Sequence, residues 1–279
     1  MSYLKKLKSF DLESLTIMGT SIDFIWGIII AIILLVYIII GTGIINISIF
    51  IMALATAFLT LIISIPKIFG AAFLYNILIN KLMDINVEIK NMDEITNISI
   101  IPTATIVAII SLIIWIVLYP ILFVVISILY PILSLFVIQG SVSLGLIGLL
   151  LIDPLSLVYA FVVPFFSIII ASFVFNKVTP FIGGIKVSLG EEGDKTALNH
   201  VNPISVGIIS GIIYLVLALI IGLIISIIVG NLPAMLMIIL ILAIGGLASG
   251  FICGTLCSFL YNVLSKKLGV IKLGLEDIE

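Results

Sequence analysis

Lys67 is the charged residue that stands out in this chain, because it lies inside a long apolar segment. Counting back from Asn76 at about 1.5 Å per residue places it about 13 Å along a helix from that residue. Asp23 lies near the start of the preceding apolar segment, on the same side of the expected helix pair. Ionisable residues within membrane helices mark functional sites, but a lysine can also extend its side chain to the headgroups. Asp23 and Lys67 are therefore a candidate polar site, and both interpretations stay open.

The other groups that could act as nucleophiles, bases or metal ligands form no catalytic set. Cys253 and Cys257 are the only cysteines, and two thiols four residues apart on one helix cannot easily reach disulfide geometry. The single histidine, His200, and the acidic pairs Asp93-Glu94 and Glu191-Glu192 lie in polar segments that are expected to be solvated loops. We therefore expect no enzyme activity, no catalytic residues, no metal site and no cofactor.

The composition indicates a polytopic membrane protein. Hydrophobic residues make up 63 % of the chain and charged residues 9 %, whereas charged residues are about a quarter of a soluble domain. The lipid bilayer is therefore the first expected partner. All 12 basic residues are lysines, and bidentate recognition of phosphates and bases depends on arginine. We expect no nucleic acid partner.

The elements that must position these residues follow from a pattern that occurs three times. It consists of a phenylalanine, any residue, an aromatic residue and an asparagine, and each copy ends a long apolar segment. We call each copy a signature. Aromatic residues favour the membrane interface, and Gly183 and Gly269, seven residues after two of the asparagines, are typical of helix ends. The next five residues alternate in polarity like a short strand. The signature residues are Phe73, Tyr75 and Asn76; Phe173, Phe175 and Asn176; and Phe259, Tyr261 and Asn262.

The signatures, together with the segments that open each helix pair, resemble a bacterial and archaeal family of small transmembrane domains of unknown function. The opening segments here are Asp11-Leu12-Glu13-Ser14, Pro102-Thr103-Ala104 and Pro203-Ile204-Ser205. Because the family unit is one two-helix hairpin, the resemblance implies three units in tandem over nearly the whole chain. The first copy lacks the glycine pair and the second has Phe175 in place of tyrosine. The resemblance implies no activity.

The expected fold class is an all-α membrane protein. Six transmembrane helices form three tandem two-helix hairpin repeats, and each hairpin is followed by a short cytoplasmic β-strand. The repeats are expected at residues 1–92, 93–196 and 197–279. Residues 1–20 are expected to be a basic leader before the first span. The segment Val142–Ile152 is too short to span the membrane, so it is expected to lie in the interface or to re-enter.

Two further patterns concern packing and orientation. Gly246, Gly250 and Gly254 have the four-residue spacing that lets two helices approach closely. Eleven of the 12 lysines lie at the chain ends or in the two connections that follow signatures. By the positive-inside rule these parts face the cytoplasm. We therefore expect a multi-pass protein of the cell (plasma) membrane with both termini cytoplasmic.

Two functions remain open at this stage. The scarcity of buried polar groups favours a non-enzymatic scaffold or accessory subunit that docks membrane or cytoplasmic protein partners at its cytoplasmic face. Asp23 and Lys67, with the proline-kinked helices, favour a transporter or channel for a small solute. A water-accessible polar cavity between the spans would indicate the second, and a dry, packed interior the first. A lipid-modifying enzyme ranks third, because the sequence offers no catalytic set.

Overall fold

Six long apolar helices dominate the computed structural model, which describes residues 2–43, 47–136, 155–230 and 232–278. Each of the six helices is long and apolar enough to cross a membrane. The segment Val142–Ile152, expected to lie in the interface or to re-enter, is outside the described residues. The helices are α1 (Leu12–Thr42), α2 (Ile47–Leu78), α3 (Ile100–Phe136), α5 (Leu155–Ile182), α6 (Pro203–Val229) and α7 (Leu232–Leu268).

The expected all-α class is incomplete, because a β-sheet of six strands accompanies the helices. Three strands follow the signatures as expected, and three more precede a helix. Residues 1–20 are therefore not a leader: a strand ends at Phe10 and α1 begins at Leu12. The strands are β1 (Ser2–Phe10), β2 (Asn86–Lys90), β3 (Glu94–Ile98), β4 (Ile185–Glu192), β5 (Lys195–Val201) and β6 (Ile271–Asp277).

The six strands form a closed antiparallel barrel in the order β1-β2-β3-β4-β5-β6. Two hairpins join β2 to β3 and β4 to β5, with tight turns in which Asn91, Met92 and Gly193 have positive φ angles. The first and last strands of the chain, β1 and β6, pair and close the barrel. The expected solvated loops are thus hairpins: Glu94 begins β3, Glu191-Glu192 end β4, and His200 lies on β5.

Apolar side chains fill the inside of the barrel. One contact cluster contains residues of β1 to β4 and β6, and Ala197 of β5 is only 4 % exposed. Because side chains of a strand alternate between its two faces, side chains from five strands can meet only inside the barrel. A barrel of so few strands has room for side chains and not for a channel. The strand residues of the cluster are Leu7, Phe10, Val87, Ile89, Ile95, Ile98, Leu189 and Leu275.

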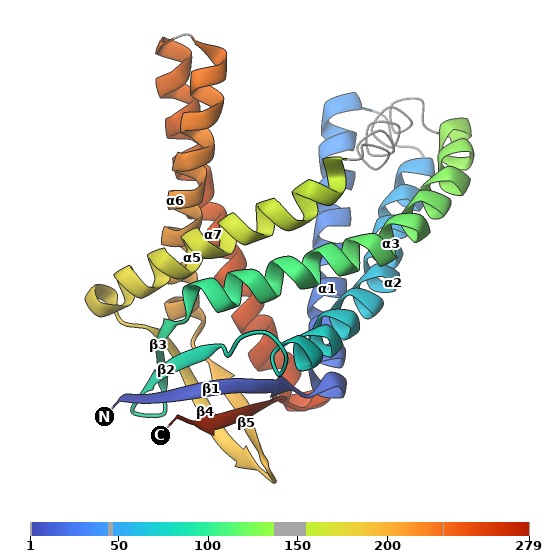
Figure 1. Cartoon of the computed structure of the whole chain (residues 1–279). Coiled ribbons are helices and arrows are strands. Elements are labelled where there is room, and N and C mark those ends of the chain that lie inside the picture. The colour runs from blue at the N-terminus through green and yellow to red at the C-terminus, as the bar shows by residue number, and fades with distance from the viewer. Residues whose placement is uncertain (1, 44–46, 137–154, 231, 279) are drawn as a thin grey trace.

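The helices leave the barrel as three antiparallel pairs, α1 with α2, α3 with α5, and α6 with α7 (Figure 1). Neighbouring pairs touch through α2 and α3, α5 and α6, and α1 and α7. Away from the barrel the pairs point in different directions (Figure 1). Large apolar side chains remain exposed along all six helices, as expected for surfaces that contact lipid.

The contact between α6 and α7 is close because glycines line it. A Cβ atom at Gly250 would lie 2.6 Å from the backbone oxygen of Ser210. At Gly246 it would lie 2.6 Å from Ala218 Cβ, and at Gly254 2.6 Å from Ser210 Oγ. The three glycines therefore face α6, the neighbouring helix in sequence.

Candidate functional site

The side chain of each signature asparagine binds both backbone groups of a single residue. Asn76 accepts from the Phe10 N–H through Oδ1 and donates through Nδ2 to the Phe10 carbonyl, both at 2.8 Å. Asn176 binds Ile98 in the same way, at 2.9 and 2.8 Å. The sequence pattern predicted a membrane-interface anchor and missed this role. Each asparagine fastens the end of a strand to the helix that carries the signature.

The third signature repeats the contact with an additional neighbour. Asn262 accepts from the Val201 N–H at 3.0 Å and donates to the Val201 carbonyl at 2.7 Å. Its Nδ2 also lies 3.2 Å from His200 Nε2. In all three copies one residue separates the bound residue from the first residue of a helix pair. That residue is Asp11, Ser99 or Asn202. The signatures therefore set the point at which the chain passes from the barrel into the helices.

A second set of bonds joins each signature's strand to the start of the next helix pair. The N–H groups of Asn86, Lys186 and Lys272 donate to the hydroxyl oxygens of Ser99, Ser205 and Ser14, respectively, at 3.1 to 3.2 Å. The carbonyls of the same three strand residues accept from the N–H groups of Ser99, Asn202 and Asp11. Because the third of these links joins the last strand to the first helix, the bonds complete a ring around the barrel mouth.

The aromatic residue before each asparagine also serves this junction. Tyr75 donates its hydroxyl to the Leu7 carbonyl at 2.7 Å, and Tyr261 donates to the Leu198 carbonyl. Phe175 has no hydroxyl, but Thr179 on the next turn of the same helix donates to the Thr96 carbonyl at 2.6 Å. The phenylalanine that opens each signature has a different environment, because it is 46 to 54 % exposed in all three copies. It faces outward, as an interface aromatic would.

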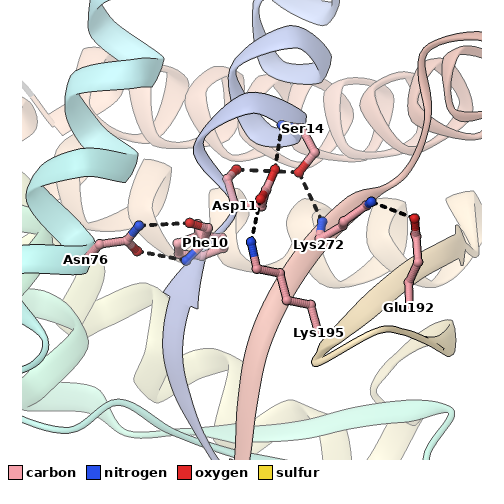
Figure 2. A network of polar contacts seen from close by, with 7 residues as sticks. All are labelled: Phe10, Asp11, Ser14, Asn76, Glu192, Lys195 and Lys272. Carbon is pink, nitrogen blue, oxygen red and sulfur yellow. Dashed lines mark hydrogen bonds and ion pairs between the residues drawn. The ribbon is translucent and has the colours of Figure 1, made fainter.

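Charged side chains reinforce the junction where β1 passes into α1 beside the start of β6 (Figure 2). Asp11 accepts the Ser14 N–H at 3.0 Å and pairs with the Lys195 ammonium at 2.5 Å. Lys272 on β6 pairs with Glu192 at 2.5 Å, and this contact raises the pKa of Lys272. The hydrogen bond from Lys195 and that from Ser14 lower the pKa of Asp11 from 3.8 to about 2. The tip of the β4–β5 hairpin is thereby tied to α1 and β6.

The lowered pKa of Asp11 predicts a specific loss of stability in acid. Because the folded pKa lies below the unfolded one, the interaction stabilises the fold above a pH of about 4 and is lost as the pH falls to about 2. Near neutral pH, we expect the wild-type protein to have a larger free energy of unfolding than Asp11→Asn, a variant that keeps a capping oxygen. In denaturant titrations, the difference between the two proteins should shrink as the pH falls from about 4 to about 2. A difference that stays constant with pH would show that Lys195 does not stabilise the carboxylate.

The structure brings Asp23 and Lys67 together. Their side chains form an ion pair of 2.5 Å between α1 and α2, with side-chain exposures of 30 and 47 %. On the side of α1 that meets α7, Trp26 donates its indole N–H to the Cys257 sulfur at 3.2 Å. Both cysteines are free thiols. Among the described residues, no group of three histidine, cysteine or acidic side chains is placed to hold a metal ion.

Comparison of the chain with protein-family models, with curated proteins and with solved structures gave no match. Functional inference therefore rests on geometry. Two arrangements could carry a function: the barrel with its ring of junction bonds, and the ion pair between α1 and α2.

Proposed function

We propose that the protein is a non-enzymatic scaffold or accessory subunit of the cell membrane. In this proposal three tandem units, residues 1–92, 93–196 and 197–279, each contribute a helix pair to the bilayer and two strands to one cytoplasmic barrel. The first of these boundaries falls in the turn between β2 and β3, and the second falls within β5. The same bonds at all three signatures support a common unit.

The apolar filling of the barrel carries this proposal. The three helix pairs converge on the barrel, so a route that runs between all three pairs would have to pass through it. Val87 and Ile89 are 7 and 2 % exposed there and pack with side chains of four other strands. A filled barrel supports a rigid hub that holds three helix pairs in place. It offers no aqueous route through the barrel, which disfavours a central channel.

A docking face for a protein partner fits the barrel end that carries both chain termini (Figure 1). Leu4 and Ile278 are exposed there at 47 and 39 %, and the Ile278 N–H donates to the Leu4 carbonyl. These apolar side chains stand side by side on β1 and beyond β6, outside the helices that lipid would cover. Burial of such a patch is a common basis of protein association.

Two measurements test the scaffold proposal together. A complex isolated from the native membrane should dissociate when Leu4→Lys is introduced, although the melting temperature of the purified protein stays unchanged. The substituted lysine faces Glu88 on β2, so the strand itself should tolerate it. Liposomes that contain the purified protein should show no more solute flux than empty liposomes. Flux that Lys67→Met abolishes would overturn the scaffold in favour of transport.

Orientation is tested by accessibility of single cysteines in a Cys253→Ser and Cys257→Ser background. Eleven of 12 lysines lie on the barrel or in the helix turns next to it, which supports a cytoplasmic barrel by the positive-inside rule. We expect a membrane-impermeant thiol reagent to label cysteines at 40 and 228 in intact cells, and cysteines at 93 and 194 only after lysis. Labelling of 93 from outside would reverse the proposed orientation.

The ion pair between Asp23 and Lys67 favours the second candidate, a small-solute transporter with an off-axis polar site. If the pair lies in a water-poor site, Lys67→Met should leave the Asp23 carboxylate without its partner and lower the free energy of unfolding. Adding Asp23→Asn should then restore part of that loss. A double-mutant cycle in detergent micelles measures this coupling. Absence of coupling would mean that both groups are solvated separately, and it would remove the residue pair on which the transporter depends.

A further inference from the structure

A hollow lies between the end of α5, the start of β4 and the start of α6. Its volume is about 230 Å³, well above the ~10–15 Å³ that a cavity needs to hold one water. Ile204 and Ile208 form one part of its wall and are 63 and 41 % exposed. Gly184, Lys186, Asn202 and Ser205 form another part. The hollow is therefore amphipathic, and it lies where one apolar helix ends and the next begins.

Lys186 is the lining residue whose charged group is free. Asn202 Oδ1 accepts from the N–H groups of Ile204 and Ser205, and the Ser205 hydroxyl accepts from the Lys186 N–H. The Gly184 N–H donates to Glu94, which lies opposite Lys186 on β3. Among the described residues, no acidic group lies within ion-pair distance of the Lys186 ammonium. Helix-end groups are thus satisfied, and the lysine is left to meet a ligand.

The corresponding positions at the other two junctions differ in charge. After the first signature, Asp84 and Asn86 stand where Gly184 and Lys186 stand after the second, so no lysine is present. After the third signature, Lys272 is present, but Glu192 pairs with it. The cap residue is also charged there, because Asp11 takes the place of Asn202. Of the three positions, only that of Lys186 combines a free ammonium with an uncharged helix cap.

We propose that this hollow binds an anionic phospholipid, with its phosphate on Lys186 and an acyl chain along Ile204 and Ile208. The inference rests on the proposed membrane placement, because the hollow must lie at headgroup level. Lysine binds phosphate as a compact point charge. The exposed isoleucines at the start of α6 continue the apolar surface of that helix, so an acyl chain follows them into the bilayer. A free phosphate ion would use the lysine but gain nothing from the apolar wall.

The test measures lipid binding to the full-length protein in detergent by native mass spectrometry. Dioleoylphosphatidylglycerol should bind more tightly than dioleoylphosphatidylcholine. Since a hydrogen bond to a charged group contributes about 1.5 kcal/mol or more, Lys186→Gln should weaken phosphatidylglycerol binding about tenfold. Lys186→Arg should preserve it. The matched control is Lys267→Gln at the end of α7, which lies outside the hollow and should leave binding unchanged.

Three outcomes would overturn the inference. The first is that the wild-type protein binds the two lipids with equal affinity. The second is that Lys186→Gln binds phosphatidylglycerol as tightly as wild type does. The third is that Lys186→Gln abolishes the binding of inorganic phosphate while lipid binding persists. The last would assign the lysine to a soluble anion. If the two lipids bind equally but the cysteines are labelled as expected for a cytoplasmic barrel, only this lipid site is refuted. Labelling of position 93 from outside would instead refute the proposed orientation.

Discussion

Replacement of Gly250 by leucine is expected to separate α6 from α7 and to destabilise the protein strongly. A Cβ at this position would lie 2.6 Å from the Ser210 backbone oxygen and 2.7 Å from Tyr214 Cβ. Neither atom is the flexible end of a side chain, so the helices themselves must move. Overpacking of this kind costs about 1–3 kcal/mol, and the lost contact along the glycine face adds to that cost. Thermal unfolding in detergent should show a clearly lower midpoint.

Gly245 provides the matched control for this substitution. It lies five residues earlier on the same helix, and a Cβ there would meet nothing within 4 Å. Gly245→Leu should be neutral or slightly stabilising, because leucine favours a helix over glycine by up to about 1 kcal/mol. Equal midpoints for the two variants would contradict the close α6–α7 contact. A lower unfolding midpoint for Gly250→Leu but not for Gly245→Leu would establish that this face of α7 packs on protein.

Asn76→Ala should have the second large effect, because it removes two hydrogen bonds from one residue. The N–H and carbonyl of Phe10 would both lose their partner in a partly buried position. An unpaired buried backbone group costs about 1–3 kcal/mol, and here two such groups are released. We expect a lower free energy of unfolding and faster hydrogen exchange of the Phe10 amide, because the end of β1 would no longer be fastened to α2 through the asparagine.

Asn80→Ala is the control for the asparagine. Asn80 lies four residues further on, just past the end of α2, and its side chain donates to the Asn76 carbonyl at an exposed position. This variant should unfold like wild type. Asn76→Asp keeps an acceptor for the Phe10 N–H but places a carboxylate against the Phe10 carbonyl. This variant should therefore be no more stable than Asn76→Ala. An Asn76→Ala variant as stable as Asn80→Ala would show that water satisfies the Phe10 backbone.

The helices could be predicted because their signal is local. An apolar run of sufficient length determines a spanning helix by itself, and the four-residue spacing of Gly246, Gly250 and Gly254 needs only one turn of helix to define a face. The strands after the signatures were also visible, since alternation from Ile85, Ile185 and Ile271 is a pattern of adjacent residues. In each case the physical cause operates within about ten residues.

The strand β1 was missed for a physical reason. Three of its residues, Lys5, Lys6 and Lys8, are basic, which is also typical of a charged leader. In the structure they pair with acidic residues far away in the chain, Lys5 with Asp277 and Lys8 with Glu276 on β6. Whether such a segment is a strand depends on two partner strands, β2 and β6, that lie beyond the first helix pair and at the far end of the chain. No local pattern records that distance.

What the sequence by itself determined is therefore the six long apolar helices of the chain, its three signatures and the separation of 11 of its 12 lysines from the apolar segments. Tertiary structure alone decided that the strands close into a barrel. It also decided that each signature asparagine binds the backbone of Phe10, Ile98 or Val201, and that Lys67 meets Asp23. Helix formation is satisfied by hydrogen bonds within one segment, whereas a strand or an asparagine side chain finds its partner only after distant segments have been brought together.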